Sequence, residues 1–320
     1  MSDSILNTII SDLFNLTKLT YNKAHKTKPI QYVKSPKYKG QGIYIPIGKT
    51  SNSTIYLNLK EDSNTYITGT TGSGKSTCLK AMLCNLIQNY KPYELSFYIC
   101  DLKRSELNIF SDLKHTKAYI YELNNLYPLL ASVLSECHRR FDLFAKAKVS
   151  NIYEYNAIKE NHLDEQILII EEFVLVQDKK CLSLLKQILA ISRACGIHSI
   201  LTLQRADATL LTPLIKSLIS NKISFKCVSE TNSNIAIDSP LAFGIDTPGK
   251  GYLRCGSRLV HFQAFNITTE QVKEIAKSYE KPVRKDAPSN KPTVVVNATD
   301  LVPTEPPVVL NNDKLDLDSF

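Results

Sequence analysis

The sequence lacks the features that mark secreted and membrane-spanning chains. No window approaches the roughly 20 continuous apolar residues of a membrane span, and no basic segment precedes the first apolar residues as in a signal peptide. The eight cysteines form no C-x-x-C pair and no zinc-type spacing. We therefore expect a cytoplasmic protein with free thiols, which would reach a membrane only through a partner.

The composition otherwise resembles that of an ordinary soluble globular protein. The chain has 320 residues, of which 43% are hydrophobic and 22% charged, enough for one large or two small domains. Its formal net charge of +8 favours a polyanionic partner. Nucleic acid, acidic lipid headgroups and nucleotides all satisfy that condition.

Both ends of the chain differ from its centre. Residues 4–19 have apolar side chains at helical spacing, which predicts an amphipathic helix. The stretch 18–39 is basic and has no acidic residue, so it is either a solvated linker or a contact for a phosphate backbone. Residues 281–320 are Pro-rich, polar and acidic at the finish, which predicts a disordered tail. We assign 1–40 and 281–320 as extensions, and the first helix and the tail are candidate contacts for a protein partner.

Strand and helix patterns alternate through the central region, residues 41–280. Two short β-type runs between 42 and 59 come first, and strands are predicted near 94–101, 166–176, 198–204 and 222–228. Helical patterns over 79–90, 123–147, 181–195 and 209–220 separate them. Such alternation predicts an α/β fold with a mostly parallel sheet covered by helices on both faces.

The segment "GTTGSGKST" fits G-x-x-x-x-G-K-[ST] and lies between a predicted strand and a predicted helix. Its glycines let successive backbone N–H groups curl around a phosphate oxygen, and the helix N-terminus adds partial positive charge. Lys75 would pair with the terminal phosphates of ATP and Ser76 would ligate Mg²⁺. The predicted cradle consists of Gly69, Thr70, Thr71, Gly72, Ser73, Gly74, Lys75, Ser76 and Thr77.

Two adjacent carboxylates, Glu171 and Glu172, interrupt the apolar run "ILIIEEFVLV". Carboxylates that only cap a strand would not be followed by further apolar residues, which leave them partly desolvated. A phosphate cradle needs an acidic contact for Mg²⁺ and a group that orients water, both at the C-terminal ends of neighbouring strands. The two glutamates meet that demand.

With these motifs in order, the chain resembles the motor domain of the FtsK/SpoIIIE family over about residues 40–270. The similarity is carried by "TGTTGSGKST", "SFYICDLKRSELNIF", "HRRFDLFAKAKVSNIYEYN", "IIEEF", "SRACGIHSILTLQRAD" and "LIKSLISNKISFKCVSETNSNIAID". The resemblance implies a RecA-like P-loop ATPase that forms a ring, usually a hexamer, around duplex DNA and moves along it. By position, Glu171 would hold Mg²⁺ through water, Glu172 would be the catalytic glutamate, Gln204 would sense the γ-phosphate, and Arg193 would be an arginine finger. At Arg193 the residues alone allow an ordinary surface salt bridge equally well.

Candidate DNA contacts are Lys216 and Lys222, where the family places pore-facing loops, and Lys146 and Lys148, in a loop after Arg139 and Arg140. Scattered lysines suit a motor that grips phosphates without reading bases, and they also suit solubility. The chain departs from the family in having Glu171 where Asp is usual, and in having no recognisable membrane spans or winged-helix module. It therefore resembles a minimal motor of the kind found on plasmids, integrative elements or phages. The alternatives are a conjugation coupling ATPase, a protein-secretion ATPase and a nucleotide-dependent scaffold.

Overall fold

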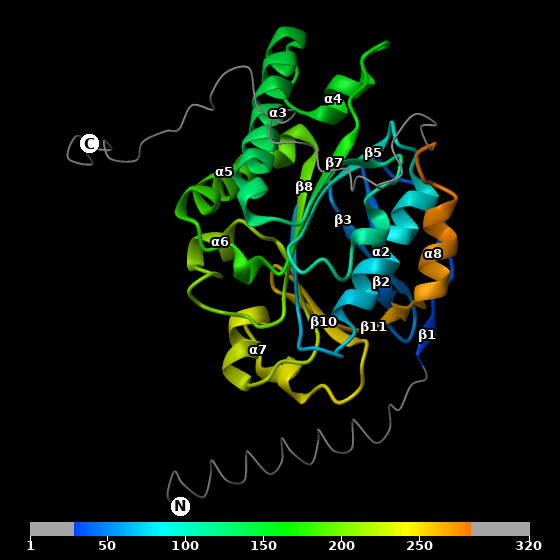
Figure 1. The fold of residues 1–320 in the computed structure, drawn as a ribbon, viewed down its shortest axis with the longest axis vertical. Coiled ribbons are helices and arrows are strands. Elements are labelled where there is room, and N and C mark those ends of the chain that lie inside the picture. Colours follow the sequence, from blue (N-terminus) through cyan, green and yellow to red (C-terminus); the bar gives the residue numbers. More distant parts are fainter. Residues whose placement is uncertain (1–28, 283–320) are drawn as a thin grey trace, which may run out of the picture.

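The computed structural model describes residues 29–282. The predicted amphipathic helix over 4–19 and almost all of the predicted tail lie outside these residues. The predicted α/β class is confirmed, because a large sheet carries helices on both faces (Figure 1). Within the described part of the chain, no helix is both long and apolar enough to cross a bilayer.

The sheet contains every strand of the described chain. The strands are β1 (Ile30–Gln31), β2 (Tyr44–Lys49), β3 (Thr54–Asn58), β4 (Asn64–Thr68), β5 (Leu95–Asp101), β6 (Thr116–Ile120), β7 (Glu165–Glu171), β8 (Ile197–Leu203), β9 (Asn221–Ser224), β10 (Lys250–Cys255) and β11 (Arg258–Asn266). Their order is β3-β2-β11-β10-β9-β4-β8-β7-β5-β6, and β1 pairs with β11. The part from β9 to β6 is parallel, whereas β10, β11, β2 and β3 continue it in antiparallel fashion.

Helices of very different length cover the sheet. They are α2 (Lys75–Asn89), α3 (Leu126–Ala147), α4 (Ile152–Ala157), α5 (Lys179–Cys195), α6 (Pro213–Ser217), α7 (Glu230–Ile237) and α8 (Thr269–Lys277), with short 3₁₀ turns at Asn108–Phe110, Leu123–Asn125, Phe173–Leu175 and Pro240–Gly244. Helices α2 and α8 pack on one face, and α3, α5, α6 and α7 on the other (Figure 1). Two separate apolar cores result, one on each face.

The strands β5, β7 and β8 are buried along their whole length. Continuous apolar runs such as "ILII" in β7 are typical of parallel strands that are covered on both faces. Helix α5 begins with an Asp178 cap and ends at Gly196, whose φ of 69° permits the turn into β8. A Cβ at Gly196 would lie 2.5 Å from Ile152 Cδ1, so this turn requires glycine for two reasons.

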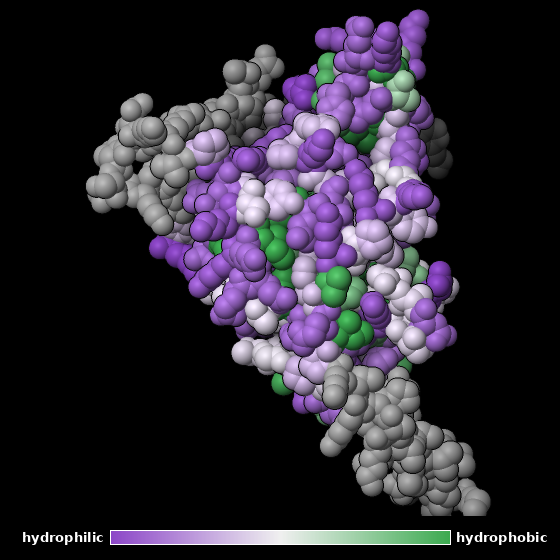
Figure 2. All heavy atoms as spheres, turned by 90° about the vertical axis from the view of Figure 1, so that its right-hand side faces the viewer, coloured by the Kyte–Doolittle hydropathy of each residue, from purple (hydrophilic) through white to green (hydrophobic). Residues whose placement is uncertain are grey.

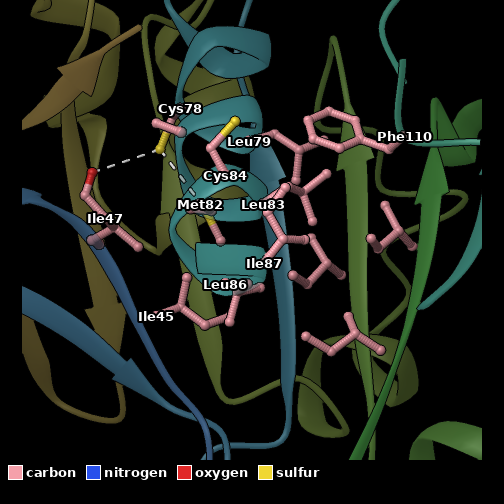
Figure 3. Close-up of a cluster of buried hydrophobic side chains, with 14 of the residues drawn as sticks. Ile45, Ile47, Cys78, Leu79, Met82, Leu83, Cys84, Leu86, Ile87 and Phe110 are labelled. Atoms are coloured by element: carbon pink, nitrogen blue, oxygen red, sulfur yellow. Dashed lines mark hydrogen bonds between the residues drawn. The ribbon is translucent and has the colours of Figure 1, made fainter. Parts of the chain in front are cut away.

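Helix α2 is anchored by its apolar face (Figure 3). Leu79, Met82 and Leu86 are at most 1% exposed and pack in the same core as Ile45 of β2 and Phe110. Each such side chain contributes about 1.5–3 kcal/mol when it is fully buried. This packing holds the start of α2, and the phosphate cradle before it, against the sheet. The side of the molecule that carries α8, at the right of Figure 1, is largely hydrophilic, with only small hydrophobic patches (Figure 2).

The structure corrects two predicted element lengths. The strand predicted over 166–176 ends at Glu171, and a 3₁₀ turn follows from Phe173 to Leu175. The apolar run "FVLV" fills the core without extending the strand; Phe173, for example, is fully buried. The helix predicted over 209–220 is limited to Pro213–Ser217, since Thr212 and Pro213 begin a new helix there.

Arg140 is a fully buried cation that joins three elements. Its guanidinium donates to Glu136 Oε1 (2.7 Å), to the backbone carbonyls of Asp164 and Cys195 (both 2.8 Å) and to Asp164 Oδ1 (3.1 Å). These bonds link α3 to the start of β7 and the end of α5. The neighbouring Arg139 is half exposed and, among the described residues, bonds only to Glu136 within its own helix.

We expect Arg140→Met to lower the free energy of unfolding by about 3–5 kcal/mol, because the backbone carbonyls of Asp164 and Cys195 lose their guanidinium donor, and Glu136 and Asp164 lose a buried cation. Arg139→Met is the matched control and should cost no more than about 1 kcal/mol. Urea unfolding of both variants measures the difference. Equal losses would show that the buried network does not stabilise the fold.

Candidate functional site

The phosphate cradle lies at the C-terminal end of β4, between β8 and β9. The backbone N–H of Gly69 donates to Leu203 O (3.2 Å) and that of Thr70 to Lys226 O (3.0 Å), so both neighbouring strand ends hold the loop. Helix α2 then begins at Lys75, and the first N–H groups of a helix have no acceptor within it. The loop therefore presents free donors and the positive end of a helix at one point, which suits an anion.

Gly74 is required by its surroundings as well as by its backbone. Its φ of 102° is unfavourable for any residue with a Cβ, and a Cβ there would lie 2.7 Å from the Gly249 nitrogen. Gly249 also donates its N–H to Ser73 O at 2.8 Å. The segment before β10 thus contacts the cradle directly, and the sequence alone does not indicate this contact.

A cavity of about 470 Å³ opens beside the cradle. All predicted cradle residues except Gly69 and Ser73 line it, together with Glu171 and Gln204. The far wall is formed by Pro29 before β1, by Pro248 and Gly249, and by the end of β11 at Phe265 and Asn266. The cavity is large enough for a nucleotide-sized ligand.

Lys75 is buried and has a weak polar contact, from its Nζ to Thr202 Oγ1 at 3.4 Å. In the described part of the chain its ammonium group makes no ion pair. Burial lowers the pKa of Lys75, while the charges of Glu171 and Glu172 act in the opposite direction. A buried cation that lines a cavity without a partner is suited to an anionic ligand.

Glu171 ends β7 directly opposite Asp101, the last residue of β5. Both side chains are almost fully buried, and within residues 29–282 Glu171 Oε2 and Asp101 Oδ1 accept no hydrogen bond. Burial, and then the neighbouring Asp101 carboxyl, raises the pKa of Glu171 to about 8. The other Asp101 oxygen, Oδ2, accepts from the Leu107 N–H and the Tyr119 hydroxyl, both at 3.1 Å. Asp101 is thus fixed, and Glu171 keeps a free oxygen.

Glu172 has a different environment from its neighbour. Its backbone is left-handed, with φ 56° and ψ 58°, which turns the chain sharply after the strand. The carboxylate is 3% exposed and lies 2.7 Å from Lys103 Nζ through Oε2. Its Oε1 accepts from the Gln204 N–H, and its own N–H donates to Thr202 Oγ1, both at 3.2 Å.

Two residues at the end of β8, Thr202 and Gln204, form hydrogen bonds with Lys75 and Glu172. Thr202 Oγ1 accepts from both Lys75 Nζ and the Glu172 N–H. Gln204 holds Glu172 through its backbone and lines the cavity. The geometry therefore brings together Lys75, Glu171, Glu172 and Gln204, which come from three separate sequence motifs.

The donor set fits ATP with Mg²⁺. In the described chain no cluster of three or more His, Cys, Asp or Glu side chains is arranged to hold a metal by itself. Mg²⁺ characteristically binds through one or two carboxylates together with substrate phosphates and water. The unpartnered Glu171 Oε2 and the Ser76 side chain on the same cavity match that pattern.

Arg193 lies outside the cavity. It is exposed in the last turn of α5, just before β8 begins, and its Nε donates to Lys60 O at 3.2 Å. The cradle is at the opposite end of the parallel strands, roughly 20 Å away along a strand of seven residues. Arg193 cannot therefore reach the cavity of its own chain.

The candidate DNA contacts form two groups. Lys216 and Lys222 both bind Asp238, at 2.7 and 3.1 Å, so one carboxylate partly neutralises them. Lys146 and Lys148 are exposed at the end of α3, next to α4. Helices α4 and α6 are well separated in Figure 1. The structure does not bring the four lysines into a single patch.

Sequence patterns did not identify Asp101, Lys103 and Thr202 as members of the site. All three lie within two residues of the C-terminal end of β5 or β8, and β7 runs between those strands. The sequence feature that could have identified them is a polar residue at or near the end of each strand. The cavity wall at Pro29 and Phe265 had no such signal, since it depends on the pairing of β1 with β11.

Comparison with known proteins shows which family the chain resembles in sequence. Residues 37–242 match the model of the FtsK/SpoIIIE family. The chain is 29% identical to a DNA translocase FtsK of Staphylococcus epidermidis over 282 residues, covering 80% of this chain and 35% of that protein. It is also 29% identical to a DNA translocase FtsK of Lactiplantibacillus plantarum over 231 residues, covering 68% of this chain and 27% of that protein. The chain thus spans about a quarter to a third of the length of these relatives.

Solved structures with similar folds include P-loop ATPases with different roles. The pCW3 conjugation coupling protein TcpA, in its monomer form with ATPγS, has a TM-score of 0.69 and 21% identity, covering 80% of this chain and 75% of that one. The cytoplasmic domain of the type VII secretion ATPase EccC from Thermomonospora curvata has a TM-score of 0.65 and 20% identity, covering 80% and 32%. At this identity they show the fold alone. The family match, which covers most of the chain and includes both the cradle and the two glutamates, shows that the chain belongs to the FtsK/SpoIIIE family.

Proposed function

We propose that the chain is an ATP-hydrolysing motor that moves DNA, and that it works as a ring of identical subunits. The observation that carries the proposal is the single cavity where Lys75, Ser76, Glu171 and Gln204 meet in a chain of this family. The net charge of +8 agrees with a polyanionic substrate. DNA is favoured as the polyanion, since the curated relatives are named DNA translocases, and we propose its double-stranded form as the substrate.

Each group at the cavity has a proposed role. The cradle N–H groups and Lys75 would bind the phosphates of ATP, and Ser76 with Glu171 would hold Mg²⁺. The metal would neutralise charge on the phosphate oxygens. Glu172 would orient and deprotonate the attacking water, and Gln204 would contact the terminal phosphate. The wall at Pro29 and Phe265 leaves room for the nucleoside.

The test is ATP turnover without DNA, with double-stranded DNA and with single-stranded DNA, each at a low and a high salt concentration. We expect duplex DNA to stimulate turnover at low salt and salt to weaken the effect, because phosphate contacts release counterions. Preferential stimulation by single strands would favour a conjugation coupling ATPase. Turnover that ignores both DNA forms at low salt would contradict the proposal and favour a secretion ATPase.

We expect Arg193→Ala to reduce turnover by about 10³-fold, since Arg193 would stabilise charge on the ATP of a neighbouring subunit. Mixing Arg193→Ala with Lys75→Ala subunits should restore activity, because one partner supplies an intact cradle and the other an intact arginine. Mixing Arg193→Ala with the double variant is the control and should restore none. Absence of rescue in the first mixture would indicate that Arg193 only supports the Lys60 carbonyl.

We infer a cytoplasmic location. All eight cysteines are free thiols and all but Cys255 are buried, which suits a reducing compartment. Recruitment to a membrane would occur through a protein partner. The segments before Pro29 and after residue 282 are the proposed contacts for it.

A further inference from the structure

Lys103 pairs with one carboxylate and also lines the cavity proposed to hold phosphates. Its Nζ lies 2.7 Å from Glu172 Oε2, yet the residue also lines the cavity proposed to take the phosphates of ATP. Glu172 does not line that cavity, although both groups that bind its carboxylate, Lys103 and the Gln204 backbone, do. The carboxylate proposed to act on water is therefore held outside the space where water would attack.

The backbone around Lys103 is held by hydrogen bonds, whereas its side chain is partly exposed. Arg104 N–H donates to Asp101 O at 3.0 Å, and Leu107 N–H to Asp101 Oδ2 at 3.1 Å. Glu106, on the same turn, binds Lys80 of α2 at 2.5 Å. The Lys103 side chain is 31% exposed, against 3% for Glu172. A flexible four-carbon arm on a rigid turn can exchange partners without rearranging the fold.

The difference in charge favours movement of the Lys103 ammonium group from Glu172 to a phosphate. The carboxylate carries a single negative charge, whereas the terminal phosphates of ATP carry several and would lie beside the same cavity wall. Without Lys103, the buried Glu172 carboxylate keeps, among the described residues, only the hydrogen bond from the Gln204 backbone N–H. The lysine is thus held by Glu172 when the cavity has no phosphate, and a terminal phosphate competes for it.

We propose that Lys103 is a positioning residue that restrains the Glu172 carboxylate until a terminal phosphate in the cavity draws the ammonium group away. The proposal rests on the proposed function, since it takes ATP as the ligand of this cavity. Its consequence is that the ion pair reduces affinity for ATP and not for ADP, because breaking the pair consumes part of the binding free energy. Lys103 would then couple release of the glutamate to the presence of the third phosphate.

The test is a double-mutant cycle on nucleotide affinity, measured by calorimetry with a β,γ-imido analogue of ATP and with ADP. We expect Glu172→Gln to raise affinity for the analogue by roughly tenfold and to leave ADP affinity nearly unchanged. In the Lys103→Met background, the same Gln substitution should have less than about a threefold effect. Lys103→Arg keeps the charge and should retain most of the coupling.

Lys80→Met is the matched control, since Lys80 lines the same cavity but pairs with Glu106. In that background Glu172→Gln should keep its full effect. Lys103→Met alone leaves a buried carboxylate without its cation, so its folding is checked by thermal unfolding. If it fails to fold, the Lys103→Met/Glu172→Gln variant, which has no orphaned charge, is compared with Glu172→Gln. The double variant should then show a lower preference for the analogue over ADP.

Two results would overturn the proposal while leaving the ATP site intact. One is that Glu172→Gln changes affinity for the analogue equally with and without Lys103. The other is that it changes affinity for the analogue and for ADP equally. In the fallback comparison, an unchanged preference for the analogue would do the same. Failure of the unsubstituted chain to bind either nucleotide would instead overturn the proposed function, and this proposal with it.

Discussion

Lys75→Ala is expected to abolish nucleotide binding, with a loss of affinity of about 100-fold or more. The ammonium group is buried at the cradle and pairs with no carboxylate among the residues that the structure describes, so its charge is available to phosphates. A charge-assisted hydrogen bond in a buried site contributes about 1.5–3 kcal/mol, and the lost charge attraction adds to it. Calorimetric titration with ATP and Mg²⁺ measures the change.

The control for this substitution is Lys117→Ala, which removes a cation that pairs with Asp164 outside the cavity. Its nucleotide affinity should match that of the unsubstituted chain. Retention of tight ATP binding by Lys75→Ala would show that the backbone donors of the cradle suffice, and that Lys75 has another role.

Glu172→Gln should lower turnover by roughly 10³-fold while nucleotide binding is retained or becomes tighter. The amide has nearly the same shape but cannot accept a proton from water, and a positioned general base contributes roughly 10²–10⁴-fold. The measurement combines steady-state turnover with affinity, so that a chemical defect is separated from a binding defect.

Glu94→Gln provides the comparison, because Glu94 is also ion-paired, to Lys37, but lies away from the cavity. It should turn over normally. Normal turnover by Glu172→Gln would shift the role of base to another carboxylate at the same strand ends, and Asp101 and Glu171 would be the next residues to substitute.

Features that depend on a short contiguous pattern could be predicted from the sequence. The cradle is encoded within nine residues, and the buried strand before Glu171 is an apolar run with a clear end. The alternation of strands and helices was sufficient for the α/β class and the parallel sheet. The end of β7 was placed too late because apolar residues filling a core turn look the same as apolar residues in a strand.

Features that depend on which strands become neighbours could not be predicted. The Asp101–Glu171 contact exists because β5 pairs with β7 in one register, and a shift of one residue would separate the carboxyls. The ion pair of Lys103 with Glu172 also joins residues that are far apart in the sequence. The same holds for the ion pairs of Lys216 and Lys222 with Asp238. A single sequence carries no direct signal for any of them.

The strand order has a consequence for how the chain acquires its binding site during folding. The cradle follows β4, but the strands on either side of β4 are β8 and β9, more than 120 residues later in the sequence. Such non-local pairing is slow, because the entropy of closing a long loop is lost before the contacts compensate it. A chain emerging from synthesis therefore has no nucleotide site until β8 and β9 have joined the sheet. Nucleotide then stabilises only the completed fold, by mass action, and its binding reports that folding has finished.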